Sequence, residues 1–210
     1  MKIRRLLRLC CLCCVAAALF SCAPRNAIVE KSPVTALPLP ELTPRGTLVV
    51  HGEYEFMPPP ASWEMFKGTP TSHYVMGFYR KDPDKSPLAS TFFAFDEDPY
   101  GFSRNLEKRA QECLKRYFWA SILQVTVLDQ KRVQILGGDG LAVTFEGTDP
   151  VKKIKVKSKL LFGHRGERVV AFYINQWRSL DGSYDDSVYE TFDKFVNSFS
   201  FLKKSFYETL

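Results

Sequence analysis

Cysteine is the residue type most able to do chemistry at the start of this chain. Five of the six cysteines lie within the first 22 residues, and four of them form the pattern C-C-x-C-C. Closely spaced thiols can bind zinc or pair as disulfides. The first 22 residues, however, hold no histidine, aspartate or glutamate. We therefore interpret Cys10, Cys11, Cys13 and Cys14 as small apolar residues of a hydrophobic segment, and not as a metal or disulfide site.

The composition around these cysteines indicates a secretory signal peptide. Four cationic residues precede an apolar run of twelve residues, 9–20. As a helix this run rises only about 18 Å, which is too short to cross a hydrocarbon core of about 30 Å. A basic start, a short apolar run and a small residue at its end are the parts of a signal peptide. We predict that residues 1–21 are removed.

The end of this segment, Leu-Phe-Ser-Cys at positions 19–22, resembles the lipobox of bacterial lipoproteins, although Phe20 is larger than the residue usually found there. By this resemblance Cys22 receives a diacylglyceryl thioether, the chain is cut before it, and the new amino group is acylated. Several acyl chains hold a protein stably at a membrane. An ordinary cleaved signal and a retained anchor are the alternatives. Ala23, standing where an aspartate would favour the inner membrane, favours the outer membrane facing the periplasm by resemblance to sorting in enteric bacteria.

Removal of residues 1–21 changes both the thiol count and the charge. Cys113 remains as the one thiol beside the acylated Cys22, so no intramolecular disulfide can form. The net charge falls from +6 to +2, because 25 of the 29 lysines and arginines and all 23 acidic residues remain. The pI of about 9.0 therefore does not indicate nucleic-acid binding. Cys113 lies on the apolar side of a predicted helix, so we interpret it as a buried structural thiol.

Residues 22–45 are rich in proline and residues 46–210 are rich in aromatic residues. The first stretch holds five prolines and no aromatic residue, which is typical of an extended, partly stiff tether. The second stretch is long enough for one domain with its own core. We predict a single domain over 46–210.

Periodicity in the domain predicts strands, a helix, more strands and a second helix. The predicted helices cover 103–122 and 183–197, and Ser183 with Asp186 resembles the capping box of the second one. The predicted strands cover 47–56, 62–66, 73–81, 87–95, 123–135, 141–147, 153–162 and 167–177. The order indicates an α+β fold, with a largely antiparallel sheet of about six to seven strands flanked by two main helices.

Lysines alternate along the strand predicted over 153–162. If Phe162 pairs with Glu167 across the turn Gly-His-Arg-Gly, the lysines share one face of the hairpin, and the second strand is apolar on both faces. Aligned cations can attract an anionic lipid headgroup, lipopolysaccharide or an acidic protein. The alternative is a solvated face whose lysine stems cover apolar neighbours. The candidate partner-binding residues are Lys153, Lys155, Lys157 and Lys159.

Two acidic segments are weaker candidates. On one strand, His51, Glu53 and Glu55 would point the same way and could bind zinc or a related ion, but a solvent-facing polar strip explains them equally well. The segment that holds Asp96 and Asp98 lacks the spacing of a calcium loop, so we interpret it as a solvated loop. Neither segment leads us to expect a metal or another cofactor. No nucleophile elbow or histidine-based constellation indicates catalysis.

Three segments in this order resemble the PsbP-like family, whose fold is also used by DcrB-type bacterial lipoproteins. They are PPPASW, which ends at Trp63, then QILGGDGLAVTFEG, and finally FDKFVNSFSF over 192–201. The run Gly137, Gly138, Gly140 departs from the single glycine of that family's pattern. The resemblance covers about 47–202 and implies an α/β/α sandwich. Members of the family are mainly accessory and protein-binding modules without a shared catalytic set.

The sequence therefore predicts a non-enzymatic accessory module, anchored in the cell envelope by lipid and binding an envelope protein or an anionic envelope component. The first alternative is a lipoprotein that binds a metal or small ligand through His51, Glu53 and Glu55. The second is a hydrolase whose motif is not recognisable.

Overall fold

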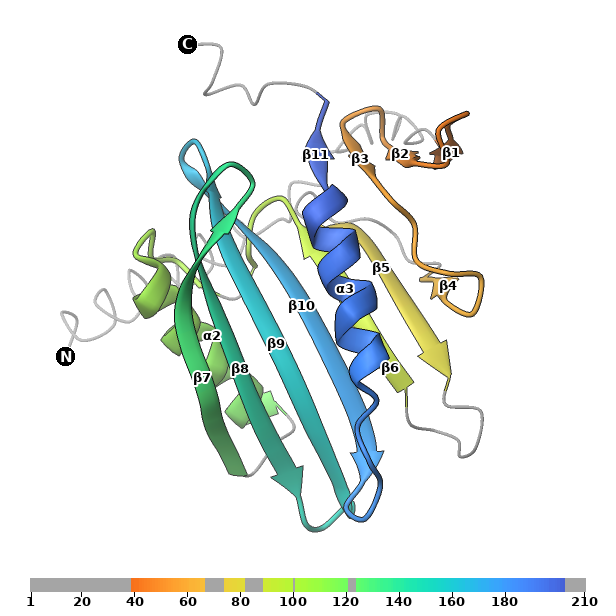
Figure 1. Ribbon diagram of the computed structural model, residues 1–210. Coiled ribbons are helices and arrows are strands. Elements are labelled where there is room, and N and C mark those ends of the chain that lie inside the picture. The colour runs from red at the N-terminus through yellow and green to blue at the C-terminus, as the bar shows by residue number, and fades with distance from the viewer. Residues whose placement is uncertain (1–38, 67–73, 82–88, 100, 121–123, 203–210) are drawn as a thin grey trace, which may run out of the picture. The chain divides into compact units, whose positions relative to one another are not determined.

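The computed structural model describes residues 39–66, 74–81, 89–99, 101–120 and 124–202 (Figure 1). These residues form a seven-stranded sheet, a four-stranded sheet and two helices, α2 (Leu106–Ala120) and α3 (Asp186–Ser198). All strand pairs are antiparallel. The predicted α+β class with two flanking helices is thus confirmed. Among the described residues, no helix is long and apolar enough to cross a membrane.

The large sheet places the four longest of the described strands side by side. Its order is β4-β5-β6-β10-β9-β8-β7. The strands are β4 (Glu64–Met65), β5 (Tyr74–Lys81), β6 (Ala89–Phe95), β7 (Gln124–Ile135), β8 (Gly138–Asp149), β9 (Ile154–Arg165) and β10 (Arg168–Ser179). Figure 1 shows α3 on one face of this sheet, in front of β10 and β6, and α2 behind the sheet on the other face.

Tight turns join the four long strands. Leu136 and Gly137 both have positive φ, 55° and 78°, between β7 and β8, as a type I′ hairpin turn requires. The β9–β10 turn is shorter than the predicted Gly-His-Arg-Gly, because β9 continues to Arg165 and Gly166 turns at a φ of 56°. Phe162 therefore pairs with Ala171 and not with Glu167. The observed pairing is shifted from the predicted one by an even number of residues. Each side chain of the hairpin therefore points to the predicted face of the sheet, although its predicted partner on the other strand is wrong.

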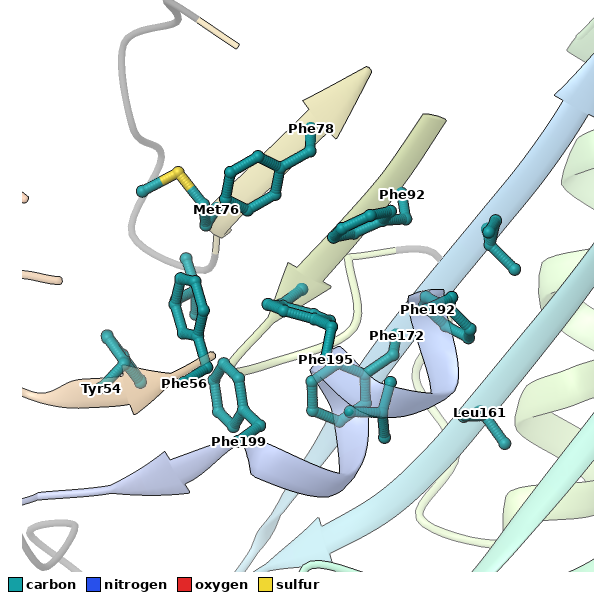
Figure 2. Packing of buried hydrophobic residues seen from close by; sticks show 14 of the residues in the cluster. Tyr54, Phe56, Met76, Phe78, Phe92, Leu161, Phe172, Phe192, Phe195 and Phe199 are labelled. Atoms are coloured by element: carbon teal, nitrogen blue, oxygen red, sulfur yellow. The ribbon is translucent and has the colours of Figure 1, made fainter. Parts of the chain in front are cut away.

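A core lies on each face of the large sheet. On the α3 face, Phe195 lies 4.9 Å from both Phe56 and Phe92, measured between ring centroids, and Figure 2 shows rings from β3, β5, β6, β10 and α3 gathered around these contacts. On the α2 face, the helix buries Leu106, Ala110, Cys113 and Leu114. The central strand β10 is buried on both faces, as predicted.

The single strand predicted over 47–56 is wrong, because these residues form two strands of the small sheet. Its order is β1 (Glu41–Leu42), β2 (Leu48–Val50), β3 (Tyr54–Phe56) and β11 (Ser200–Phe201). His51 and Gly52 take positive φ values of 55° and 66°, and the Glu53 amide donates to the Val50 carbonyl at 3.0 Å. The chain thus reverses in a hairpin turn where alternation predicted one continuous strand. β1 includes residues that the sequence assigned to the tether.

The helix ends also differ from the predicted ones. The helix α2 begins at Leu106 and not at the predicted residue 103, and Phe102 before it is 82% exposed. The N-cap of α3 is Asp185 and not Ser183. Its carboxylate accepts from the Ser187 amide at 3.0 Å and from Arg80 at 2.5 Å, so the cap also ties α3 to β5.

Candidate functional site

The β9 lysines lie beside α3. Lys155, Lys157 and Lys159 alternate along one face of β9, whereas Lys153 lies in the turn before it with a φ of 54°. The predicted strip of four lysines is therefore a strip of three on the strand. On β8 their neighbours are Thr148, Glu146 and Thr144, in the same order.

Aromatic and acidic side chains from α3 and the segment before it hold these lysines. The Lys159 ammonium lies 2.5 Å from the Asp193 carboxylate. Lys157 lies over the rings of Tyr184 and Tyr189, at 5.7 and 5.6 Å, and Lys155 lies over Tyr184 at 5.1 Å. Burial raises the pKa of both tyrosines well above the ordinary value, so they stay neutral. The lysines are therefore packed against α3 rather than standing as an open cationic surface.

A groove of about 480 Å³ follows this contact between α3 and strands β7, β8 and β9. It exists because α3 lies over β10 and β6, which leaves the outer strands uncovered on this face (Figure 1). Its apolar lining comes from Val133, Ile135, Ala142, Leu161 and Val196. Its charged lining comes from Lys131, Lys157, Lys159, Asp129, Asp186 and Asp193. Cations and acids are thus balanced around an apolar floor.

A second hollow of about 440 Å³ continues from the groove at the C-terminal end of α3. Gln134, Ile135, Val196 and Asn197 line both spaces. The second hollow ends at the β7–β8 turn and at β11. The two spaces thus lie next to each other along α3.

The geometry proposed for a metal site at residues 51–55 is not present. His51 stands in the β2–β3 turn, so it does not share a strand face with Glu55. The Glu55 carboxylate instead accepts hydrogen bonds from Thr47 at 2.5 Å and from Arg45 at 3.1 Å. Within the described ranges, no group of three or more histidine, cysteine, aspartate or glutamate residues could hold a metal ion. The turn at His51 and Gly52 is the physical reason for this correction.

Asp96 is buried in an ion-pair network, contrary to the solvated loop predicted there. Its carboxylate accepts from the Arg165 guanidinium at 3.0 and 3.1 Å, from Arg168 at 3.2 Å and from the Tyr54 hydroxyl at 2.9 Å. The Arg165 guanidinium also lies 3.8 Å from the ring centroid of Phe201. The network ties the small sheet to the end of the β9–β10 hairpin. Its partners are distant in sequence, so no local pattern indicates it.

Asp98 forms a second buried network under α2. It accepts a hydrogen bond from the Tyr173 hydroxyl and lies 3.5 Å from the Arg109 guanidinium. Cys113 donates to the Tyr173 oxygen at 3.6 Å. Burial, followed by the nearby Asp98 charge, raises the pKa of the Cys113 thiol to about 12, so the predicted buried thiol is confirmed. These contacts fix α2 on the sheet.

The predicted lipid-attachment residue lies outside the described residues. Cys22, the segment 1–21 and the tether up to residue 38 are not among them. Lipidation of Cys22 therefore stays a prediction.

No protein-family model matches the chain, and no curated protein matches it significantly. Similar solved structures include the cyanobacterial PsbP (CyanoP) of Synechocystis sp. PCC 6803, 14% identical over 70% of this chain and 86% of that chain, with a TM-score of 0.44. LpqN, involved in cell envelope biogenesis of Mycobacterium tuberculosis, is 15% identical over 70% of this chain and 82% of its own, with a TM-score of 0.45. A structure from Bacteroides thetaiotaomicron VPI-5482 is 16% identical over 72% of this chain and 46% of that chain, with a TM-score of 0.37.

Proposed function

We propose that this protein is a membrane-anchored lipoprotein of the cell envelope that acts as a non-catalytic protein-binding module, with the groove beside α3 as its binding surface. The observation that carries the proposal is the lining of this groove, an apolar floor bordered by charges of both signs. Binding sites for protein segments combine an apolar centre with a polar rim in this way.

The balance of charge favours a protein segment over a polyanion. Lys131, Lys157 and Lys159 face the groove, but so do Asp129, Asp186 and Asp193. A phosphate-rich headgroup would meet the carboxylates as well as the ammonium groups. A segment that alternates apolar, acidic and basic side chains can match both signs while its apolar residues lie on the floor.

The buried carboxylates support a structural role rather than a catalytic one. Asp96 is held by Arg165 and Arg168, and Asp98 by Arg109 and Tyr173. Both carboxylates are almost completely buried. Carboxylates that are paired and enclosed in this way hold elements together and are not presented to a substrate.

Anchoring at Cys22 would leave the domain free to reach its partner. The eighteen residues between Cys22 and β1 span at most roughly 60 Å when extended. The tether therefore allows the groove to stand well above the lipid surface, where the facing segment of another envelope protein can enter it.

The test places a photo-crosslinking amino acid at Asn197, an exposed position that lines the groove, in the full-length protein in its native membrane. We expect a covalent adduct with a specific envelope protein, and we expect Val133→Arg to abolish this adduct by filling the floor. Gln111, an exposed residue of α2 on the opposite face of the sheet, supplies two matched controls. One places the crosslinking amino acid at position 111, and the other combines Gln111→Arg with the crosslinker at position 197. The proposal fails if the adduct survives Val133→Arg or forms equally from position 111.

A further inference from the structure

The edge strand β7 is exposed along almost its whole length. Among the strands that the structure describes, it is the last of the large sheet and pairs only with β8. Nine of its twelve side chains are exposed, on both faces of the sheet. They include the aliphatic side chains of Val127 and Leu128, at 46% and 50% exposure. A long exposed edge presents unpaired backbone donors and acceptors that another strand can satisfy.

A bulge divides this edge into two parts. The ladder to β8 is irregular between Val127 and Asp129, with Leu128 as the extra residue. From Asp129 to Ile135 the pairing is regular. The regular part begins with Asp129, Gln130, Lys131 and Arg132, of which all but Gln130 are charged.

We propose that β7 pairs antiparallel with β7 of a second copy of this chain, around a two-fold axis at Gln130. Among axes at residues 129–132, the charges of β7 favour the one at Gln130. An axis at Asp129 would oppose two acids, whereas an axis at Lys131 or at Arg132 would oppose two cations. With the axis at Gln130, Asp129 of each copy lies opposite Lys131 of the other copy, which gives one pair of opposite charges on each side of the axis. Opposite charges stabilise a cross-strand pair and like charges destabilise it.

The faces of the sheet agree with this register. Residues opposite one another in an antiparallel pair point to the same face. Asp129 and Lys131 both line the groove, so both point to the α3 face. An axis between two residues would oppose side chains from different faces and is therefore excluded. Within one copy, Asp129 and Lys131 already lie 3.3 Å apart and are half exposed, so the same charges can pair across the axis.

Pairing would join the two grooves. Because Asp129 and Lys131 line the outer side of the groove, the second copy's β7 would extend the floor beyond that side. The grooves of the two copies would then face the same way across one continuous sheet. The inference rests on the edge strand alone and holds whatever the groove binds.

Disulfide crosslinking tests the axis directly. Opposed residues of an antiparallel pair have Cα atoms about 4.5–5.5 Å apart, which a disulfide can bridge. We expect Gln130→Cys in the full-length, membrane-bound protein to form a disulfide-linked dimer under mild oxidation. The matched control is Gln134→Cys, exposed on the same strand, because this residue and its copy would be more than about 20 Å apart. Cys113 is buried and gives no background.

Charge exchange tests the register. Asp129→Lys and Lys131→Asp should each weaken the Gln130→Cys dimer about tenfold, because each opposes like charges twice. Mixing the two variants should restore crosslinking between them, because opposite charges then face each other on both sides of the axis, in one pair with the signs exchanged. Equal crosslinking at 130 and 134, no dimer at 130, or an adduct with a different protein would each overturn the proposal. Asn197→Arg, which blocks the proposed partner site from α3 and lies outside β7, should leave the dimer at 130 intact, so the two proposals fail separately.

Discussion

Replacing Asp96 by asparagine should destabilise the protein far more than an equivalent change at the surface. Asp96→Asn keeps the size of the side chain but removes the charge that faces two guanidinium groups. The side chains of Asp96 and Arg165 are only 5% and 7% exposed, so the buried Arg165 guanidinium would face a neutral amide in place of this carboxylate. Breaking a buried pair from one side costs about 3–5 kcal/mol.

The matched control is Asp193→Asn, which also removes one carboxylate from an ion pair. Lys159 and Asp193 lie 2.5 Å apart, but their side chains are 23% and 44% exposed. Such a pair contributes at most about 1 kcal/mol. We therefore expect the loss of unfolding free energy to be several times larger for Asp96→Asn than for Asp193→Asn.

Urea unfolding followed by tryptophan fluorescence measures this difference. With a slope of about 2 kcal/mol per molar urea, a loss of about 4 kcal/mol lowers the midpoint by about 2 M. Tyr54→Phe, which removes only the hydroxyl donated to Asp96 at 2.9 Å, should cost about 1 kcal/mol and should couple to Asp96→Asn in a double-mutant cycle. Equal midpoints for Asp96→Asn and Asp193→Asn would refute the assignment of a buried network.

Three further results are expected. The pKa of the Cys113 thiol is raised from 9.0 to about 12, so its stabilising contribution is complete below pH 9 and is lost as the pH rises towards 12. Cys113→Ala should therefore reduce the fall of the unfolding free energy in this alkaline range by about 1.4 kcal/mol per pH unit. Equal slopes of unfolding free energy against pH for the variant and the unmodified protein would contradict this. Gly140→Ala should cost about 1–3 kcal/mol in urea, because its Cβ would lie 2.6 Å from the Phe162 carbonyl oxygen, whereas Gly138→Ala meets nothing within 4 Å and should be neutral. Cys22→Ser should release the protein from the membrane fraction or leave it unprocessed, and a processed, membrane-bound variant would disprove lipid attachment.

Local patterns predicted the elements whose partners are near in sequence. The α2 stripe of Leu106, Ala110 and Cys113 and the strands of the β9–β10 hairpin follow from spacing alone. The β2–β3 hairpin was missed because His51 takes a positive φ, a conformation that alternation does not reveal and that histidine adopts infrequently. Over residues 47–56, one continuous strand and a hairpin with polar turn residues would show the same alternation of apolar and polar residues.

The two buried networks and the groove depend on distant contacts. Asp96 meets Arg165 across 69 residues, and Asp98 meets Tyr173 across 75, so a short acidic segment looked like a solvated loop. The groove arises from where α3 lies on the sheet, which periodicity does not fix. One indication was present in the sequence, because residues 129–132 are polar at every position and thus predict a strand that is uncovered on both faces.

The pairing of β3 with β11 has a consequence for the order of folding. The Ser200 hydroxyl donates to the Glu55 carbonyl across 145 residues of chain, and contacts of such high sequence separation form late. The four long strands and their tight turns can assemble from local contacts first. The small sheet of β1, β2 and β3 is then completed only when β11 is available. A chain that is synthesised or exported N-terminus first therefore completes the sheet of its earliest described strands late.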